Sequence, residues 1–332
     1  MNKAISSDSG MNQNKKAVLS AYISIGRPDH WFKNVFMVFG LLLAIFLEPA
    51  SINEGWIFSF ALAIISTCLV ASSNYVINEI LDAPKDKLHP KKRFRPIPSG
   101  KVSIPIAYIE WLLLSLLGIT LASLVNTSFL YMAILFWVAG IFYNFPPIRT
   151  KDIVYLDVIS EALNNPIRLF LGWFVLIPDQ VPPISVIIAY WMAGAFFMGS
   201  KRLAEYKMIN NHEQAGNYRA SFRRYSVETL TIGQFFYATS SAFFFGIFII
   251  RYHLELILCA PLIAGFFAYF VKLTLKPDSP VQNPEKLYKE YGFMAFIFFL
   301  FLIFILLLFT ELPVIYKIFN VVPYKINPLW SF

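Results

Sequence analysis

The sequence SSNYVINEILDAPKDKLHPKKRFRPIPSG, residues 72–100, closes a long apolar run and carries amides, acids and bases at close spacing. Asn74, Asn78, Asp82 and Asp86 recur every four residues, so a helix would place them on one face. Ionisable side chains at the end of a membrane span are costly and mark functional sites. We therefore interpret this stretch as the end of a transmembrane helix that carries a binding site.

Asn78, Asp82 and Asp86 have the chemistry of a magnesium site. Mg²⁺ takes one or two protein carboxylates and completes its coordination with substrate phosphate oxygens and water. A solvated helix end is the alternative, which four aligned positions disfavour. Because Pro84 lies between the two aspartates, we expect the helix to kink or end there, and the one-face argument weakens past Asp82. We predict Asn78, Asp82 and Asp86 as Mg²⁺ ligands.

A basic segment follows the aspartates directly, from His89 to Arg95. The guanidinium group of arginine can donate two parallel hydrogen bonds to phosphate oxygens. A basic loop that prolines make rigid can therefore bind phosphate beside a metal site. Cytoplasmic loops are rich in Lys and Arg in any case, so only some of these residues can be ligands. We favour Lys92 and Arg95 as phosphate ligands, with His89 a weaker candidate.

The composition is that of a protein embedded in lipid. Of the 332 residues, 57% are hydrophobic and only 14% are charged, whereas soluble domains carry roughly 25% charged residues. These values exclude a disordered chain and a disulfide scaffold. Cys68 and Cys259 both lie in apolar runs, so we expect buried thiols and neither a disulfide framework nor a zinc site.

Nine apolar runs are long enough to cross a bilayer, which takes about 20 residues each. They predict an all-α membrane protein built as a bundle of nine transmembrane helices. Residues 1–20 are polar, so we expect a tail there and one transmembrane domain over 21–332. The runs lie at 34–52, 56–80, 105–125, 128–147, 155–178, 183–200, 230–250, 254–273 and 291–312.

The basic residues predict the orientation of this bundle. Of the 28 Lys and Arg, 24 fall before the first run or in alternate connections, which the positive-inside rule assigns to the cytoplasm. We therefore expect a cytoplasmic N-terminus, an outside C-terminus and a multi-pass protein of the plasma (inner) membrane. The same distribution explains the net charge of +8 without a nucleic-acid partner.

A second polar cluster lies on the fifth run. A helix in lipid keeps such a stripe only when it faces a cavity or the bundle interior. A structural pair with Glu161 or Asn164 would explain Arg168, whereas Asp157, at the cytoplasmic mouth, favours a functional role. The residues that share one helical face are Asp157, Glu161, Asn164, Asn165 and Arg168.

A third cluster, Lys201-Arg202-Leu-Ala-Glu205, ends the sixth run. Lys201 and Glu205 are four residues apart, so they could simply form an ion pair worth a few tenths of a kcal/mol. Three such clusters on one membrane face nevertheless indicate a single reaction cavity that opens to the cytoplasm. The sequence has no glycine-rich phosphate loop, so side chains and metal would hold phosphate.

These motifs resemble those of the UbiA-type intramembrane prenyltransferases. Asn78-x3-Asp82-x3-Asp86, followed by Arg95-Pro-Ile-Pro-Ser-Gly, is similar to the first signature of that superfamily. The resemblance implies nine transmembrane helices and two Asp-rich motifs that bind a diphosphate through Mg²⁺. Two departures are that Glu79 stands where an Asp commonly follows the Asn, and that Asp152 and Asp157 are five residues apart instead of four.

Within the superfamily, the sequence is most similar to the decaprenyl-phosphate phosphoribosyltransferase branch, whose donor is 5-phosphoribosyl 1-diphosphate. The similar segments are Arg27–Asn34, His89–Pro96, Tyr143–Asp157 with Arg168, and Lys201–Glu205. The resemblance implies catalytic roles for Asp82, Asp86, Asp157 and Lys201. It implies substrate-binding roles for Lys33, Asn78, Lys92, Arg95, Tyr143, Lys151, Arg168, Arg202 and Glu205.

Three functions follow as hypotheses. The first is a Mg²⁺-dependent transferase that moves 5-phosphoribose from the water-soluble donor to a lipid-borne polyprenyl phosphate such as decaprenyl phosphate. Lys92, Arg95 and Lys201 would neutralise the leaving diphosphate, while Asp157, Lys151 and Arg202 would hold the acceptor phosphate or the ribose. The second keeps the site but takes an isoprenyl diphosphate and alkylates an aromatic or quinone-precursor acceptor. The third is a transporter, which intramembrane acids suit but which lacks an internal repeat.

Overall fold

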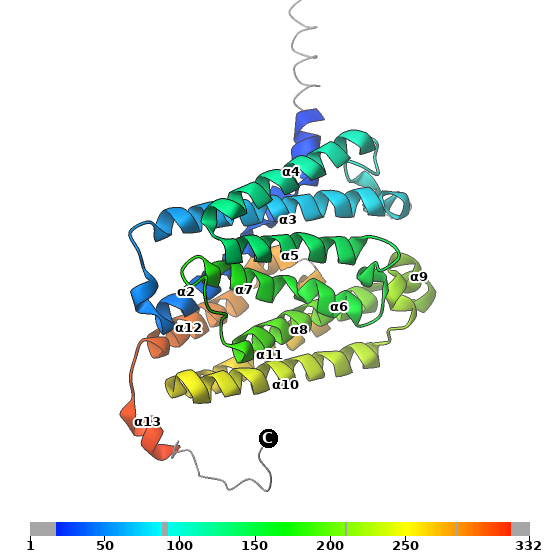
Figure 1. The fold of residues 1–332 in the computed structure, drawn as a ribbon. Helices are drawn as coiled ribbons and strands as arrows, with labels where there is room; N and C mark the ends of the chain where they lie inside the picture. The colour runs from blue at the N-terminus through cyan, green and yellow to red at the C-terminus, as the bar shows by residue number, and fades with distance from the viewer. Residues whose placement is uncertain (1–17, 88–91, 210, 283, 320–332) are drawn as a thin grey trace, which may run out of the picture.

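The computed structural model describes residues 18–87, 92–209, 211–282 and 284–319. All regular structure in these ranges is helical, and the long helices lie side by side in one bundle (Figure 1). The prediction of an all-α fold is therefore confirmed. Residues 1–17 of the expected tail and His89 of the basic loop lie outside the described residues.

Eight helical segments of the described residues are long and apolar enough to cross a membrane. The first, Val18–Leu47, is interrupted by a 3₁₀ turn, and the seventh, Leu254–Leu275, begins with one. The eight segments are Val18–Leu47 with η1 (Pro28–Val35) and α2 (Phe36–Leu47), α3 (Trp56–Asp86), α4 (Ile104–Val125), α5 (Thr127–Asn144), α8 (Ile184–Ile209), α10 (Val227–Tyr252), η6 (Leu254–Cys259) with α11 (Ala260–Leu275), and α12 (Tyr291–Leu308).

Shorter helices connect these segments. They are η2 (Pro49–Ser51), η3 (Lys92–Phe94), η4 (Thr150–Asp152), α6 (Leu156–Ala162), α7 (Asn164–Phe174), α9 (His212–Tyr218), η5 (Ala220–Arg223), η7 (Pro280–Gln282), η8 (Pro284–Lys289) and α13 (Pro313–Ile318).

The run expected to form the fifth span, 155–178, is divided into α6 and α7, neither of which reaches spanning length alone. Pro166 explains the division. It has no N–H to donate to the carbonyl of Ala162, the last residue of α6. The two pieces also pack differently, α6 against α8 and α7 against α2.

Two predicted boundaries are corrected. The first span begins at Val18 and not at residue 34, because residues 18–25 are already helical before η1 interrupts the helix. The helix α3 does not end at Pro84 but continues to Asp86. A proline this close to the C-terminus removes a hydrogen bond from the last turns only, so Asp82 and Asp86 stay on consecutive turns of one helix.

The helices α2 and α7 touch through their backbones at two glycines. A Cβ atom on Gly40 would lie 2.0 Å from the carbonyl oxygen of Leu169, and one on Gly172 would lie 1.9 Å from that of Met37. Small residues allow this close approach between helices in lipid, where van der Waals packing drives association. This contact fixes α7 beside η1 and α2.

One end of the bundle, which we call the far end, is fastened by the buried side chain of Glu255. Its Oε1 accepts a hydrogen bond from the backbone N–H of Leu312 (2.8 Å), and its Oε2 accepts one from the Tyr316 hydroxyl (3.2 Å). His253 Nδ1 lies 3.3 Å from the same Oε2, and His253 Nε2 donates to the carbonyl of Leu307 (2.7 Å). These bonds tie η6 to α12 and α13.

Candidate functional site

Most of the predicted site residues gather at the other end of the bundle, where α9 lies in Figure 1 and which we call the polar end. The C-terminal turns of α3, the loop between α5 and α6, and the second half of α8 all reach this end. Segments that are far apart in the sequence therefore contribute to one polar region.

Asp82 on α3 is bound by two cations of the α5–α6 loop. Its Oδ1 accepts hydrogen bonds from Arg149 Nη2 (2.6 Å) and Lys151 Nζ (2.7 Å). Lys151 Nζ also donates to Asn144 Oδ1 (2.8 Å), which accepts a further bond from Asn78 Nδ2 (2.6 Å). Asn78, Asp82 and Lys151 thus belong to one hydrogen-bond network. Burial lowers the pKa of Lys151 to about 8, although the charge of Asp82 opposes this shift.

Asp152 holds Arg149 in place. Its Oδ2 accepts hydrogen bonds from Arg149 Nε (2.9 Å) and Lys85 Nζ (3.1 Å). Arg149 has a left-handed backbone with φ of 31°, a conformation that costs a non-glycine residue of order 1–3 kcal/mol and clusters at functional sites. Asp152 is therefore a positioning residue for the cation that faces Asp82.

Asp86 and the basic loop form the second part of the site. Arg95 Nη1 donates to Asp86 Oδ2 (2.7 Å), and Glu79 Oε1 accepts from the backbone N–H of Ile97 (3.0 Å). Glu79 thus fastens the loop to α3 at the position where the family more often has Asp. Lys92 Nζ lies 4.9 Å from the ring centre of Tyr218 on α9, and burial lowers its pKa. The loop therefore spans from α3 to α9.

Arg202 on α8 is the centre of a third cluster. It is 1% exposed and pairs with three acids. Its Nε lies 3.3 Å from Asp157 Oδ2, its Nη1 lies 3.5 Å from Glu205 Oε2, and its Nη2 donates to Glu161. Glu205 therefore pairs with Arg202, and no ion pair of Lys201 with Glu205 occurs among the described residues.

Asp157 is fully buried at the base of this cluster. Its Oδ1 accepts a hydrogen bond from the Tyr225 hydroxyl (2.8 Å), and its Oδ2 accepts one from Ser221 (3.0 Å), with Arg219 Nη1 at 3.7 Å. Burial and the charge of Asp157 raise the pKa of Tyr225, so the phenol stays a donor. Both oxygens of Asp157 are committed, which favours a positioning role over substrate contact.

Glu161 is the accessible acid of this cluster. Its side chain is 30% exposed, whereas Asp157 is buried. Its Oε2 accepts hydrogen bonds from the Tyr143 hydroxyl (3.0 Å) and from Arg202. Since Lys151 Nζ lies 5.9 Å from the ring centre of Tyr143, Tyr143 connects the Asp82 network with the Arg202 cluster.

Arg168 lies apart from these networks. Its Nε donates to Asn34 Oδ1 (2.9 Å), its Nη1 donates to the backbone carbonyl of Asn164 (3.1 Å), and its guanidinium carbon lies 4.9 Å from the ring centre of Phe136. Of the two structural partners considered for it, Asn164 is therefore the one observed, through its backbone. The structure gives Arg168 a packing role between η1, α5 and α7.

Asn78, Asp82 and Asp86 fit a magnesium ion that is bound together with phosphate. No three His, Cys, Asp or Glu side chains of the described ranges are close enough to hold a metal by themselves. Mg²⁺ commonly takes only one or two protein carboxylates, however, and substrate phosphates complete its shell. Asp82 Oδ2 accepts no hydrogen bond from the described part of the chain, so it is available as a ligand.

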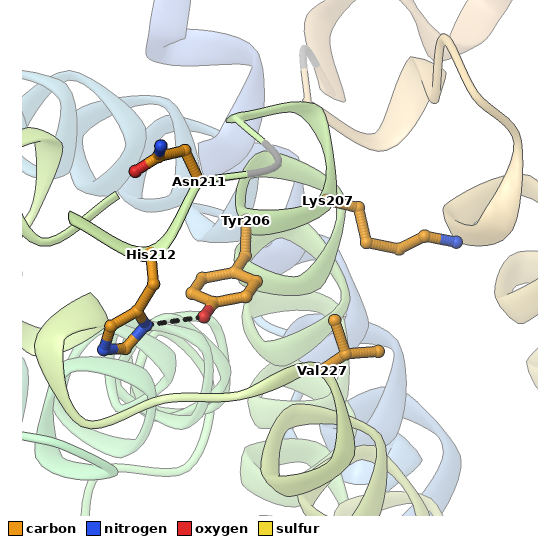
Figure 2. A pocket seen from close by; sticks show the side chains of 5 residues that line it. All are labelled: Tyr206, Lys207, Asn211, His212 and Val227. Atoms are coloured by element: carbon orange, nitrogen blue, oxygen red, sulfur yellow. Dashed lines mark hydrogen bonds between the residues drawn. The ribbon is translucent and has the colours of Figure 1, made fainter. Parts of the chain in front are cut away.

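Figure 2 shows a pocket that lies outside these networks, at the junction of α8, α9 and α10. In it, the Tyr206 hydroxyl lies 2.8 Å from His212 Nδ1. None of the predicted site residues lines this pocket, so it is not the candidate active site. Its lining residues are Tyr206, Lys207, Asn211, His212 and Val227.

Several site residues were not predicted from the sequence. Arg149 and Asn144 bind Asp82 and Lys151 directly, and His30 on η1 lies close enough to Lys201 and Arg95 for their charges to act on it. A signal for Arg149 was its place two residues before Lys151 in a short loop. The signal for His30 was a polar Arg-Pro-Asp-His segment close to an apolar run.

Comparisons with known proteins identify the family of the chain. The profile of the UbiA prenyltransferase family matches residues 35–300. Decaprenyl-phosphate phosphoribosyltransferase from Corynebacterium glutamicum is 34% identical over 227 residues, which cover 66% of this chain and 64% of that protein. The protein of the same name from Mycolicibacterium smegmatis is 27% identical over 229 residues, covering 63% and 66%. The chain thus spans just under two thirds of the length of these curated relatives.

A solved structure shares the fold. The UbiA homologue from Archaeoglobus fulgidus bound to DMAPP and Mg²⁺ superposes with a TM-score of 0.64 at 18% identity, over 85% of this chain and 98% of that one. The family profile covers most of the chain, from the end of η1 into α12. The chain therefore belongs to the UbiA prenyltransferase family, a family of membrane transferases.

Proposed function

We propose that this protein is a Mg²⁺-dependent transferase that moves 5-phosphoribose from 5-phosphoribosyl 1-diphosphate to a polyprenyl phosphate such as decaprenyl phosphate. The observation that carries the proposal is the ring of cations around the acids of α3: Arg149 and Lys151 on Asp82, and Arg95 on Asp86. The name of the curated relatives supplies the decaprenyl phosphate acceptor and the phosphoribosyl group that is transferred. Membership in a transferase family disfavours the transporter hypothesis.

The acids and cations have separate tasks in this reaction. Asn78, Asp82 and Asp86 would hold Mg²⁺, which neutralises charge on a diphosphate. Arg95 and Lys92 would bind the diphosphate oxygens and stabilise the charge that builds up as the group leaves. Each lies on the loop that bridges α3 and α9.

The chemistry needs no base from the protein. The bond between the anomeric carbon of ribose and the diphosphate oxygen breaks, and its electron pair leaves with the diphosphate. A phosphate oxygen of the polyprenyl phosphate forms the new bond to that carbon. Because the second pKa of a phosphate monoester is about 6, the attacking oxygen is already ionised near neutral pH.

The proposed topology places this site at the inner face of the plasma membrane. The α6–α7 pair would make the fifth of nine crossings, with the N-terminus in the cytoplasm and the C-terminus outside, as the basic residues indicate. The donor would enter from the cytoplasm, and the lipid-borne acceptor would enter sideways from the bilayer.

A transfer assay tests the proposal. Membranes that contain the protein are given labelled 5-phosphoribosyl 1-diphosphate and polyprenyl phosphate, with Mg²⁺ or with a chelator. We expect label in the lipid fraction with Mg²⁺, loss of at least 90% (roughly tenfold or more) with the chelator, and recovery when Mg²⁺ is restored. No label in lipid, while one of the curated relatives works in parallel, would contradict the proposal.

The second candidate is a prenyltransferase that takes an isoprenyl diphosphate and alkylates an aromatic or quinone-precursor acceptor. It is favoured by the likeness to the Archaeoglobus fulgidus structure bound to DMAPP and Mg²⁺. The same purified sample, given an isoprenyl diphosphate and an aromatic acceptor, separates the two. Prenylated product without any phosphoribosyl lipid would favour this second function.

A further inference from the structure

The segment η1 interrupts the first crossing helix at a strained residue. Arg27, directly before η1, has φ of 50° and ψ of 59°, the left-handed region that a non-glycine residue rarely occupies and that clusters at ligand sites. Arg27 and Lys33, on either side of His30 in this segment, lie close enough to act electrostatically on it. Non-helical backbone at membrane depth is tolerated where it is buried in protein or lines a water-filled cavity.

His30 has a buried nitrogen without a partner. Its side chain is 10% exposed, and its Nδ1 forms no hydrogen bond in the described structure. Its Nε2 contacts Arg27 Nη2, and its ring packs edge-on against Tyr75 with ring centres 5.2 Å apart. Arginine nitrogens are only donors, so Nε2 must accept and Nδ1 must carry the proton. Asp29 Oδ2, at 3.4 Å from Nε2, is largely exposed and forms no hydrogen bond there.

A buried donor of this kind requires an acceptor, because leaving one unpaired costs the full desolvation penalty. The charges around it indicate which acceptor. Lys33, Arg27, Lys201 and Arg95 all lie close enough to act on His30, and they come from η1, α8 and the basic loop. The missing acceptor should therefore be an anion.

The acids nearby are already occupied by arginines. Glu161 pairs with Arg202, and Asp86 pairs with Arg95. Lys201, by contrast, forms no hydrogen bond or ion pair with the described residues, although it lies near Glu161, Glu205 and Lys33. The region between η1 and α8 thus has more positive than negative charge, together with an unpaired N–H donor.

We propose that His30, Lys33 and Lys201 form a second phosphate subsite, for a phosphate monoester, next to the Asp82 and Asp86 site of the diphosphate. The proposal deepens the function proposed above and rests on it. Arg95 stands between the two subsites, since it binds Asp86 and also acts on His30. The proposed reaction offers two such monoesters, the 5-phosphate of the donor and the phosphate of the polyprenyl acceptor.

Direct binding tests the subsite without turnover. Ribose 5-phosphate and a short-chain polyprenyl phosphate are titrated separately onto the purified full-length protein, and the Kd of each is measured. His30→Phe keeps an aromatic ring against Tyr75 but removes the donor, and Lys201→Met removes the charge. We expect each variant to weaken one of the two probes about tenfold or more, as for a lost hydrogen bond to a charged group.

The arms of the experiment identify the phosphate. If the variants weaken binding of ribose 5-phosphate alone, the subsite holds the 5-phosphate of the donor. If they weaken binding of the polyprenyl phosphate alone, it holds the phosphate of the acceptor. His30→Asn, whose amide N–H lies near the position of Nδ1, should restore most of the affinity. The matched control is His212→Phe in the exposed pocket of Figure 2, which should bind both probes as the wild type does.

Unchanged affinity for both probes in His30→Phe and Lys201→Met would overturn the subsite. If either variant fails to fold, as judged by gel filtration, the other carries the test. The outcome is separable from the proposed function. If the variants lose ribose 5-phosphate binding but the wild type shows no phosphoribosyl transfer, the subsite is supported and the proposed reaction is contradicted.

Discussion

Asp82 and Asp157 are acids in neighbouring clusters, but their surroundings differ in a way that separates ligand binding from positioning. Asp82 is 19% exposed and has one oxygen without a hydrogen bond from the described residues. Asp157 is buried, and both of its oxygens accept hydrogen bonds from side chains. A metal or a phosphate can reach the first acid, whereas the second is already saturated.

Replacing Asp82 with Asn should remove activity and spare the fold. The substitution takes away the charge that would hold Mg²⁺, so we expect phosphoribosyl transfer to fall by at least about 100-fold. Lys151 keeps its bond to Asn144, which limits the structural damage. Transfer rate and thermal unfolding in detergent are the measurements, with Asp179→Asn in an exposed loop as the matched control. Turnover at the wild-type rate would remove Asp82 from the metal site.

Replacing Asp157 with Asn should instead destabilise the protein. The change leaves the buried Arg202 and the partly buried Arg219 with less compensating charge, and breaking a buried ion pair costs about 3–5 kcal/mol. We expect a clearly lower unfolding temperature than for Asp82→Asn, measured in the same detergent. An unfolding temperature equal to that of the wild type, with activity lost, would make Asp157 a substrate contact after all.

At the residue scale, the sequence was enough to find the acids but not their partners. The i, i+4 spacing of Asn78, Asp82 and Asp86 could be read directly, and the structure places all three on α3. The cations on Asp82 come from positions 67 and 69 residues further along the chain, and no local pattern encodes such a pairing. His30 was missed for a related reason, because its surroundings are assembled from three separate elements.

At the scale of elements, the apolar runs predicted most of the helices. Eight of the nine runs coincide with helices of spanning length, because hydropathy alone determines where such helices form in lipid. The break between α6 and α7 was not predicted, although Pro166 lies within the run, since whether a proline kinks a helix or divides it depends on packing. The glycine contact between α2 and α7 was also invisible, because the sequence does not say which helices touch.

That contact makes a prediction about stability. Gly40→Ala would put a Cβ atom 2.0 Å from the backbone oxygen of Leu169, so the helices must separate, at a cost of about 1–3 kcal/mol. Gly246→Ala in α10 is the matched control, since a Cβ there meets no atom within 4 Å and alanine favours the helix. We expect a lower unfolding temperature for Gly40→Ala only. Equal values for the two variants would mean that the α2–α7 contact can relax without loss.

At the scale of the whole molecule, the orientation of the bundle determines which side of the membrane the site faces. Single cysteines introduced at Ile148 and at Asp179 would flank the α6–α7 pair. The native Cys68 and Cys259 are buried. A membrane-impermeant maleimide applied to intact cells should label Asp179→Cys. It should label Ile148→Cys only after permeabilisation. Labelling of both positions from the same side would show that α6 and α7 do not cross the membrane as a unit.

The fastening of the far end by Glu255 has a consequence for where the product goes. Its bonds to Leu312 and Tyr316 hold α13 against η6 at the far end, whereas the charged groups of the proposed reaction lie at the polar end. A lipid that receives a phosphorylated sugar at the polar end would stay in the leaflet where it was made, because such a headgroup cannot cross about 30 Å of hydrocarbon unaided. Any use of that lipid on the opposite face would need a separate flippase.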